Sequence, residues 1–190
     1  FSPTSKVGQV TKTSPQGVAN QPINPLALAL AAGATFVARA VDKDPNHLSS
    51  VLKQAYEHQG SSLVEIYQDC NIFNHGAFDE FSLKSNRANQ TISLSQGQPL
   101  LFGANKEHGL ALRDESLSRV AAEDAKNYTH DTSNLMAAMR LAELTFPDFP
   151  VPLGVYYQKV REAFSFPSEF KKTVDDLPGL YRSRASWEQV

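Results

Sequence analysis

The pattern of apolar and polar positions predicts a helix followed by a strand near the start of the chain. Asn24 is a favourable N-cap and Pro25 suits the first helical position, so a short apolar helix is expected over residues 26–32. Gly33 is a suitable residue to end it. Residues 35–41 then have the β-branched and aromatic content of a strand.

The same order recurs immediately downstream. Asp44 and Pro45 repeat the helix-start signal, Gly60 ends the segment, and residues 63–68 form a second apolar strand. One face of this helix is apolar at helical spacing, at Leu48, Val51, Leu52 and Ala55. This order of elements predicts an α/β fold, with right-handed crossovers and a parallel sheet covered by helices on both faces.

The remaining segments carry weaker signals. Residues 1–24 are rich in Ser, Thr, Pro, Gly and Gln, which is typical of loop. The other expected elements are a loop with a short helix at 74–89, short strands at 91–94 and 99–102 around the Gln96–Gly97 turn, a strand at 109–113, a helix capped by Asp131 or Thr132 and ending at Leu144, a strand at 151–157, and an extended arm with short helical pieces at 160–190.

Composition excludes several classes of protein. The 190 residues are 41% hydrophobic and 20% charged, as in a globular domain with a real core. A formal net charge of -2 gives no support to nucleic-acid binding, and no apolar run is long enough for a membrane span. A single cysteine rules out an internal disulfide and fits a cytoplasmic setting. The start at Phe1 suggests a piece of a longer polypeptide.

That cysteine, Cys70, lies where the second strand ends and a loop begins. Chemistry in open parallel sheets gathers just outside the carboxyl ends of the strands. On the residues alone, three roles stay open: a buried small hydrophobe, which is the commoner case, a nucleophile paired with a base such as His75, or a metal ligand with thiolates from outside this chain.

Eight segments of the chain match a pattern known from one enzyme family. They are residues 2–5, 10–17, 24–29, 34–39, 64–74, 98–103, 129–131 and 150–155, dense over the first 74 residues and shorter later. In these segments the chain resembles the β subunit of 2-oxoacid:ferredoxin oxidoreductases, which are thiamine-diphosphate enzymes, and most closely those of the 2-oxoglutarate type.

The resemblance implies thiamine diphosphate with Mg²⁺ and one [4Fe-4S] cluster held by four cysteines. Cys70, in the motif Asp69-Cys70-Asn71, matches the fourth of these cysteine ligands. Ser2, Thr4 and Ser5 continue the Gly-rich turn that approaches the thiamine diphosphate, although a Ser/Thr turn with local hydrogen bonds is the plainer interpretation. The implied reaction is oxidative decarboxylation of a 2-oxoacid to acyl-CoA and CO₂, with electrons passed to ferredoxin.

The chain also departs from the family pattern. The Gly-Asp-Gly stretch that binds Mg²⁺, the downstream Asn ligand and the other three cysteines are absent, and all of them precede the position that matches Phe1. The chain therefore resembles the C-terminal part of a β subunit. Residues 1–102 match the end of the thiamine-diphosphate-binding α/β domain, and residues 103–190 match the C-terminal region and arm.

The resemblance implies further partners and leaves two alternatives. The expected partners are an α subunit, the missing N-terminal part of the β subunit, ferredoxin, coenzyme A and a 2-oxoacid, and this chain alone should be inactive. The alternatives are a cluster-free thiamine-dependent decarboxylase subunit and a non-catalytic assembly module of the same fold.

Lys12 is expected to be an exposed loop lysine. The pair His130-Asp131, which matches a family motif, is expected to precede and cap a helix.

Overall fold

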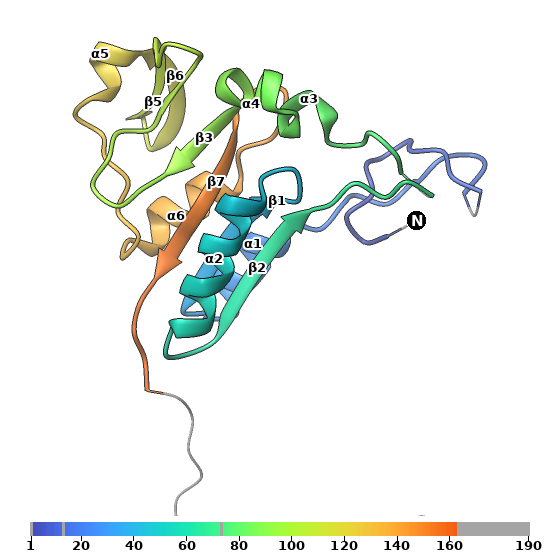
Figure 1. The fold of residues 1–190 in the computed structure, drawn as a ribbon, viewed down its shortest axis with the longest axis horizontal. Helices are drawn as coiled ribbons and strands as arrows, with labels where there is room; N and C mark the ends of the chain where they lie inside the picture. The colour runs from blue at the N-terminus through green and yellow to red at the C-terminus, as the bar shows by residue number, and fades with distance from the viewer. Residues whose placement is uncertain (1, 13, 73, 163–190) are drawn as a thin grey trace, which may run out of the picture.

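A four-stranded sheet forms the centre of the molecule, which is shown in Figure 1. The structure is a computed structural model that describes residues 2–12, 14–72 and 74–162. The strand order is β2 (Ser62–Tyr67), β1 (Phe36–Val41), β7 (Val151–Gln158), β3 (Thr91–Leu94). The chain therefore has the expected α/β fold, with a strand from near the end of the described part inserted between the early strands and β3.

The sheet is mixed, whereas the sequence predicted a parallel one. Strands β1 and β2 are parallel, and so are β3 and β7, but β7 is antiparallel to β1. The pattern identifies β7 as a buried strand, but an apolar strand can pair in either direction, so its composition carries no information about orientation.

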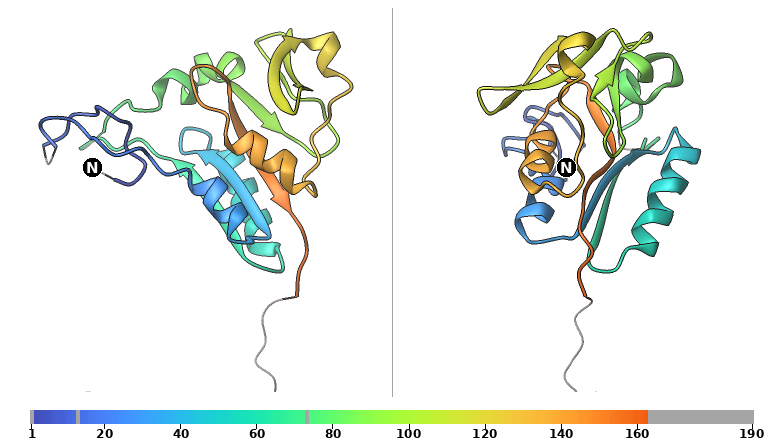
Figure 2. Two further views of the ribbon diagram at one scale, coloured as in Figure 1. Left: turned by 180° about the vertical axis from the view of Figure 1, so that it is seen from behind. Right: turned by 90° about the vertical axis from the view of Figure 1, so that its left-hand side faces the viewer.

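Helices cover both faces of this sheet, as expected. Figure 2 shows α1 (Pro25–Ala31) and α6 (Leu135–Ala142) on one side and α2 (Pro45–Glu57) on the other. On the first side Leu26 and Leu141 pack in the same core cluster as Val37 and Tyr156. On the second side the buried residues of the core are Phe36, Ala38, Val51 and Val155.

The helix starts follow from local capping. The side chain of Asn24 accepts a hydrogen bond from the Ala27 N–H at 3.1 Å, and that of Asp44 accepts one from the His47 N–H at 3.2 Å, which confirms both predicted caps. The predicted cap of α6 by Asp131 or Thr132 is wrong. Asn134 caps α6 by accepting from the Ala137 N–H at 3.0 Å, because it is the residue directly before the apolar helix.

A second, three-stranded antiparallel sheet lies beside the first. It contains β4 (Leu101–Phe102), β5 (His108–Arg113) and β6 (Ser116–Ala121), and α5 (Ala122–Ala125) follows it. The two short strands expected around the Gln96–Gly97 turn therefore belong to different sheets. Strand β6 was not predicted, because its hairpin turn uses Asp114 and Glu115 at positive φ, and glutamate is not typical there.

Between β2 and β3 the chain forms two short helices, α3 (Asp79–Ser82) and α4 (Lys84–Gln90), where one was expected. The expected C-terminal arm lies mostly in residues 163–190, outside the described residues. The division at residue 102 stays a prediction. Among the described residues no helix is both long and apolar enough to cross a membrane.

A buried ion pair joins the two parallel strands. Arg39 of β1 donates from Nε to Glu65 Oε2 of β2 at 2.6 Å and from Nη1 to the Tyr156 hydroxyl of β7 at 2.8 Å. That hydroxyl in turn donates to the Pro152 carbonyl at 2.7 Å, and burial raises the pKa of Tyr156, which keeps its proton in place. The guanidinium also lies 5.0 Å from the ring centre of Tyr67.

We expect Glu65→Ala to lower the free energy of unfolding by about 3–5 kcal/mol, because it leaves the Arg39 charge buried without its partner. Glu57→Ala is a matched control, since Glu57 pairs with Lys53 on the exposed surface of α2 and its loss should cost less than about 0.5 kcal/mol. Urea unfolding measures both values. Equal losses in the two variants would contradict this role for the buried pair.

Candidate functional site

The carboxyl ends of the parallel strands β1 and β2 bring together several ionisable side chains and the thiol of Cys70. Asp42 and Lys43 follow β1, and Asp69 and Cys70 follow β2 after one intervening residue. The two segments are in direct contact, because the Asp69 N–H donates to Asp42 Oδ2 at 2.8 Å. The site therefore lies at the edge of the sheet where open α/β folds usually bind ligands.

The carboxylate of Asp69 lies at the centre of these contacts. Its Oδ1 accepts a hydrogen bond from the Gly76 N–H at 2.8 Å, and its Oδ2 lies 3.0 Å from His75 Nδ1 and 3.9 Å from Lys43 Nζ. The Gly76 hydrogen bond is the main cause that holds the pKa of Asp69 below its usual value, with His75 and Lys43 adding to it. Asp69 is therefore an ionised, largely enclosed anchor.

Lys43 connects this anchor to α3. Its ammonium forms an ion pair with Asp79, and this hydrogen bond is the main cause that raises the pKa of Lys43. Arg87 of α4 holds the same turn, because it pairs with Asp44 and donates to the Lys43 carbonyl at 2.8 Å. The loop after β1 is thus tied to two helices as well as to the loop after β2.

Cys70 is half-buried in the loop that these contacts enclose. Its carbonyl accepts a hydrogen bond from the Asn74 N–H at 2.9 Å, and Asn74 Oδ1 accepts one from Gln9 Nε2 at 3.3 Å. The N-terminal segment therefore reaches the Cys70 loop, and Figures 1 and 2 show the two running side by side.

One thiolate is a chemically suitable cluster ligand, but it is one of the four that an iron–sulfur cluster requires. The described part of the chain contains no group of three or more His, Cys, Asp or Glu side chains placed to hold a metal ion. The described residues thus fit one ligand of such a cluster, and the other three would have to come from outside them.

Ser2, Thr4 and Ser5 lie together in a turn of the N-terminal segment. Ser2 Oγ is 3.1 Å from Thr4 Oγ1 and 3.2 Å from Ser5 Oγ, and the Ser5 N–H donates to the Ser2 carbonyl at 3.0 Å. The structure thus has the Ser/Thr turn of the plainer interpretation, and its grouped hydroxyls suit phosphate oxygens as hydrogen-bond acceptors. Lys12 is exposed, as expected.

His130 and Asp131 have structural contacts. His130 is buried, and its Nε2–H donates to the Val155 carbonyl of β7 at 2.7 Å. Asp131 Oδ1 accepts from the N–H and the hydroxyl of Ser133, at 2.9 and 2.8 Å, and so closes a turn before α6 without capping it.

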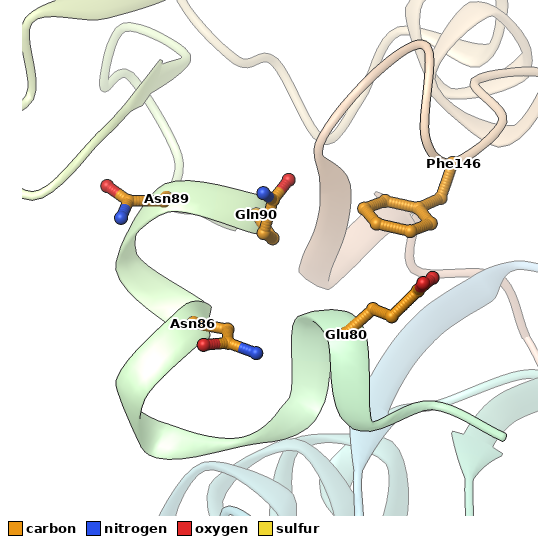
Figure 3. Close-up of a pocket in the computed structure, with 5 residues that line it drawn as sticks. All are labelled: Glu80, Asn86, Asn89, Gln90 and Phe146. Atoms are coloured by element: carbon orange, nitrogen blue, oxygen red, sulfur yellow. The ribbon is translucent and has the colours of Figure 1, made fainter. Parts of the chain in front are cut away.

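A polar depression of about 360 Å³ between α3, α4 and the loop before β7 was not predicted from the sequence. Figure 3 shows the side chains around it, which are Glu80, Asn86, Asn89, Gln90 and Phe146. This lining contains no cation, which disfavours a phosphate ligand and favours a neutral or cationic polar group. A usable signal was the spacing of the amides at 86, 89 and 90, which places them on one helix face.

Sequence reasoning also missed the contacts of Asp69 with Lys43 and His75, and that of Lys43 with Asp79. One signal was available, since an aspartate shortly follows each of the two predicted strands. The carboxyl ends of adjacent parallel strands meet at the same edge of a sheet, so Asp42 and Asp69 could have been placed together.

Parts of the chain are similar in sequence to a thiamine pyrophosphate enzyme domain and to oxidoreductase subunits. Residues 2–66 match the family model described as thiamine pyrophosphate enzyme, C-terminal TPP binding domain. The chain is 42% identical over 153 residues to the 2-oxoglutarate oxidoreductase subunit KorB of Mycobacterium tuberculosis, across 75% of this chain and 40% of that protein. It is also 42% identical over 73 residues to the 2-oxoacid:ferredoxin oxidoreductase subunit beta of Saccharolobus solfataricus, across 38% of this chain and 24% of that protein.

A solved structure is similar over nearly the whole chain. It is the 2-oxoglutarate:ferredoxin oxidoreductase from Magnetococcus marinus with 2-oxoglutarate, coenzyme A and succinyl-CoA bound. The match has a TM-score of 0.57 and 25% sequence identity, and it covers 99% of this chain and 50% of that one. The chain thus spans half or less of the length of these relatives.

We expect acid to destabilise the fold through His130. Burial lowers the pKa of His130 below its ordinary value of 6.5, so below about pH 6.5 the unfolded state binds a proton that the folded state resists. The free energy of unfolding should therefore fall from pH 7.5 to 5.5, and less steeply in His130→Gln, whose amide can still donate to Val155. Urea unfolding at several pH values measures the slope. A slope identical to that of the parent chain would contradict this account.

Proposed function

Because the chain is homologous to the β subunits of 2-oxoacid:ferredoxin oxidoreductases, we propose that it forms part of such a subunit. The proposed reaction is oxidative decarboxylation of 2-oxoglutarate, or a related 2-oxoacid, to acyl-CoA and CO₂, with electrons passed through a [4Fe-4S] cluster to ferredoxin. The observation that carries the proposal is the 42% identity to a 2-oxoglutarate oxidoreductase subunit across 75% of the chain.

In this proposal the N-terminal segment lies against thiamine diphosphate and its Mg²⁺. The match of residues 2–66 to a TPP binding domain supports this placement. The hydroxyls of Ser2, Thr4 and Ser5 are the groups of this segment that would donate hydrogen bonds to the cofactor. When bound, thiamine diphosphate supplies the carbon centre on which 2-oxoacids are decarboxylated, while the protein positions it and excludes water.

Cys70 is the proposed cluster ligand of this chain, with three further thiolates from the part of the subunit that precedes it. Its half-buried position in a loop tied to the sheet edge suits a ligand, because enclosure and nearby hydrogen bonds set the reduction potential of a cluster.

The remaining partners follow from the same proposal. They are the α subunit, the N-terminal part of the β subunit, ferredoxin, coenzyme A and the 2-oxoacid, assembled in the cytoplasm. The chain spans 40% of the mycobacterial relative and 50% of the solved one, so we expect no turnover from this chain alone.

Cys70→Ser in the complete enzyme should remove most of the visible absorption of the cluster and abolish ferredoxin reduction, because a hydroxyl is a poor substitute for a thiolate on iron. Asn71→Ser is the matched control, since it places the same hydroxyl one residue further along the loop and leaves the thiol. A Cys70→Ser enzyme with a full [4Fe-4S] spectrum would exclude the ligand role.

Replacing Ser2, Thr4 and Ser5 together by alanine should weaken thiamine diphosphate binding about tenfold or more, because hydrogen bonds to a charged group are lost. Titration of the cofactor into cofactor-free complete enzyme measures the dissociation constant. Ser85→Ala, on the exposed surface of α4, is the control. An unchanged dissociation constant in the triple variant would show that these hydroxyls do not contact the cofactor.

A further inference from the structure

The side chain of Asp69 joins the two ends of the loop that carries Cys70. The Asp69 carboxylate accepts the Gly76 N–H at 2.8 Å, so it links the first residue of the loop to a backbone amide at its far end. The next residue adds a second, inner link, because the Cys70 carbonyl accepts the Asn74 N–H at 2.9 Å. Cys70 therefore lies in a loop whose two ends are joined to each other by hydrogen bonds.

Further contacts connect the Cys70 loop to the segments around it. The Asp69 N–H donates to Asp42, and Lys43 lies between the carboxylates of Asp69 and Asp79, which joins the loop to β1 and α3. His75 Nδ1 lies 3.0 Å from the second oxygen of Asp69. Removal of this one carboxylate would thus release contacts to two separate segments of the chain, the end of the loop at His75 and Gly76 and the residue Lys43 after β1.

We propose that Asp69 is the positioning residue of the Cys70 thiolate, which it fixes relative to the sheet edge by linking the start of the Cys70 loop to Gly76. This inference rests on the proposed function, in which Cys70 binds the cluster. Asp69 would act through its contacts with the protein. Only 13% of its side chain is exposed, and both of its oxygens face protein donors.

Ligand geometry is the reason that such a residue matters. A cluster ligand must keep its sulfur at one place through repeated electron transfer, and the hydrogen bonds that orient a ligand are known to change metal affinity about 10–100-fold when removed. Gly76 supports the closed loop as well, since its φ of +75° is a conformation that glycine adopts without strain.

The test uses the complete enzyme, purified without oxygen, in four forms: parent, Asp69→Ala, Asp69→Asn and Asp131→Asn. Asp131 is a matched control, because its carboxylate also accepts a backbone N–H and closes a turn, but that turn lies before α6. Asp69→Asn keeps an oxygen for the Gly76 N–H and loses the charge that faces Lys43 and His75. It therefore remains informative if Asp69→Ala fails to assemble.

Two measurements are made on each form. Hydrogen exchange, followed by mass spectrometry, reports opening at the amides of Asn74 and Gly76, and the rate of iron loss to a chelator with the cluster EPR spectrum reports the ligand geometry. We expect exchange and iron loss to rise about tenfold or more in Asp69→Ala, and by a smaller factor in Asp69→Asn, with an altered EPR spectrum. Asp131→Asn should match the parent.

Two results would overturn the inference. One is unchanged exchange at Asn74 and Gly76 in both Asp69 variants. The other is faster exchange with iron loss and EPR spectrum like those of the parent, which would limit Asp69 to a structural role. If instead the proposed function is wrong, the Cys70→Ser enzyme would keep its cluster, and it would do so whatever the Asp69 variants show. The two failures can therefore be told apart.

Discussion

The parallel pairing of β1 with β2 is the constraint on which the candidate site depends. The two strands pair without a shift, from Phe36 opposite Ser62 to Val41 opposite Tyr67, so the segments that follow both strands leave the sheet at the same edge. There the Asp69 N–H meets Asp42, and the Cys70 loop begins. The same register places Arg39 opposite Glu65 inside the sheet. A slip of one residue would turn one of these two side chains to the other face and would separate the loops.

The parts of the fold that could be predicted are those with local signals. Asn24-Pro25 and Asp44-Pro45 begin helices through side chains three residues from the amides they cap, and such contacts do not depend on the rest of the chain. The direction of β7 could not be predicted, because it is decided by pairing with strands more than fifty residues away in sequence. The Asn134 cap was confused with nearby Asp131, whose side chain instead bonds to Ser133.

Some features of the candidate site could likewise be predicted from the sequence, and others could not. The place of Cys70 just after a strand, and the grouping of Ser2, Thr4 and Ser5 in one turn, follow from residues that are close in sequence. The contacts of Asp69 with Lys43, and of Gln9 with Asn74, depend on how separate loops meet. The position of an aspartate after each parallel strand predicts that the Asp42 and Asp69 segments lie close together, but it does not specify these side-chain contacts. The resemblance to an oxidoreductase subunit is the source of the proposed ligand role of Cys70, while the structure shows the contacts that would hold its loop in place.

In the proposed function this chain is part of an enzyme in which decarboxylation and electron transfer are coupled. The most direct test is to supply the complete wild-type enzyme with 2-oxoglutarate and coenzyme A without oxygen, and to follow CO₂, acyl-CoA and reduced ferredoxin together. The account predicts two reduced one-electron ferredoxins for each CO₂ and acyl-CoA formed, and none when coenzyme A is left out. Release of CO₂ with no reduced ferredoxin would contradict it and indicate a cluster-free decarboxylase.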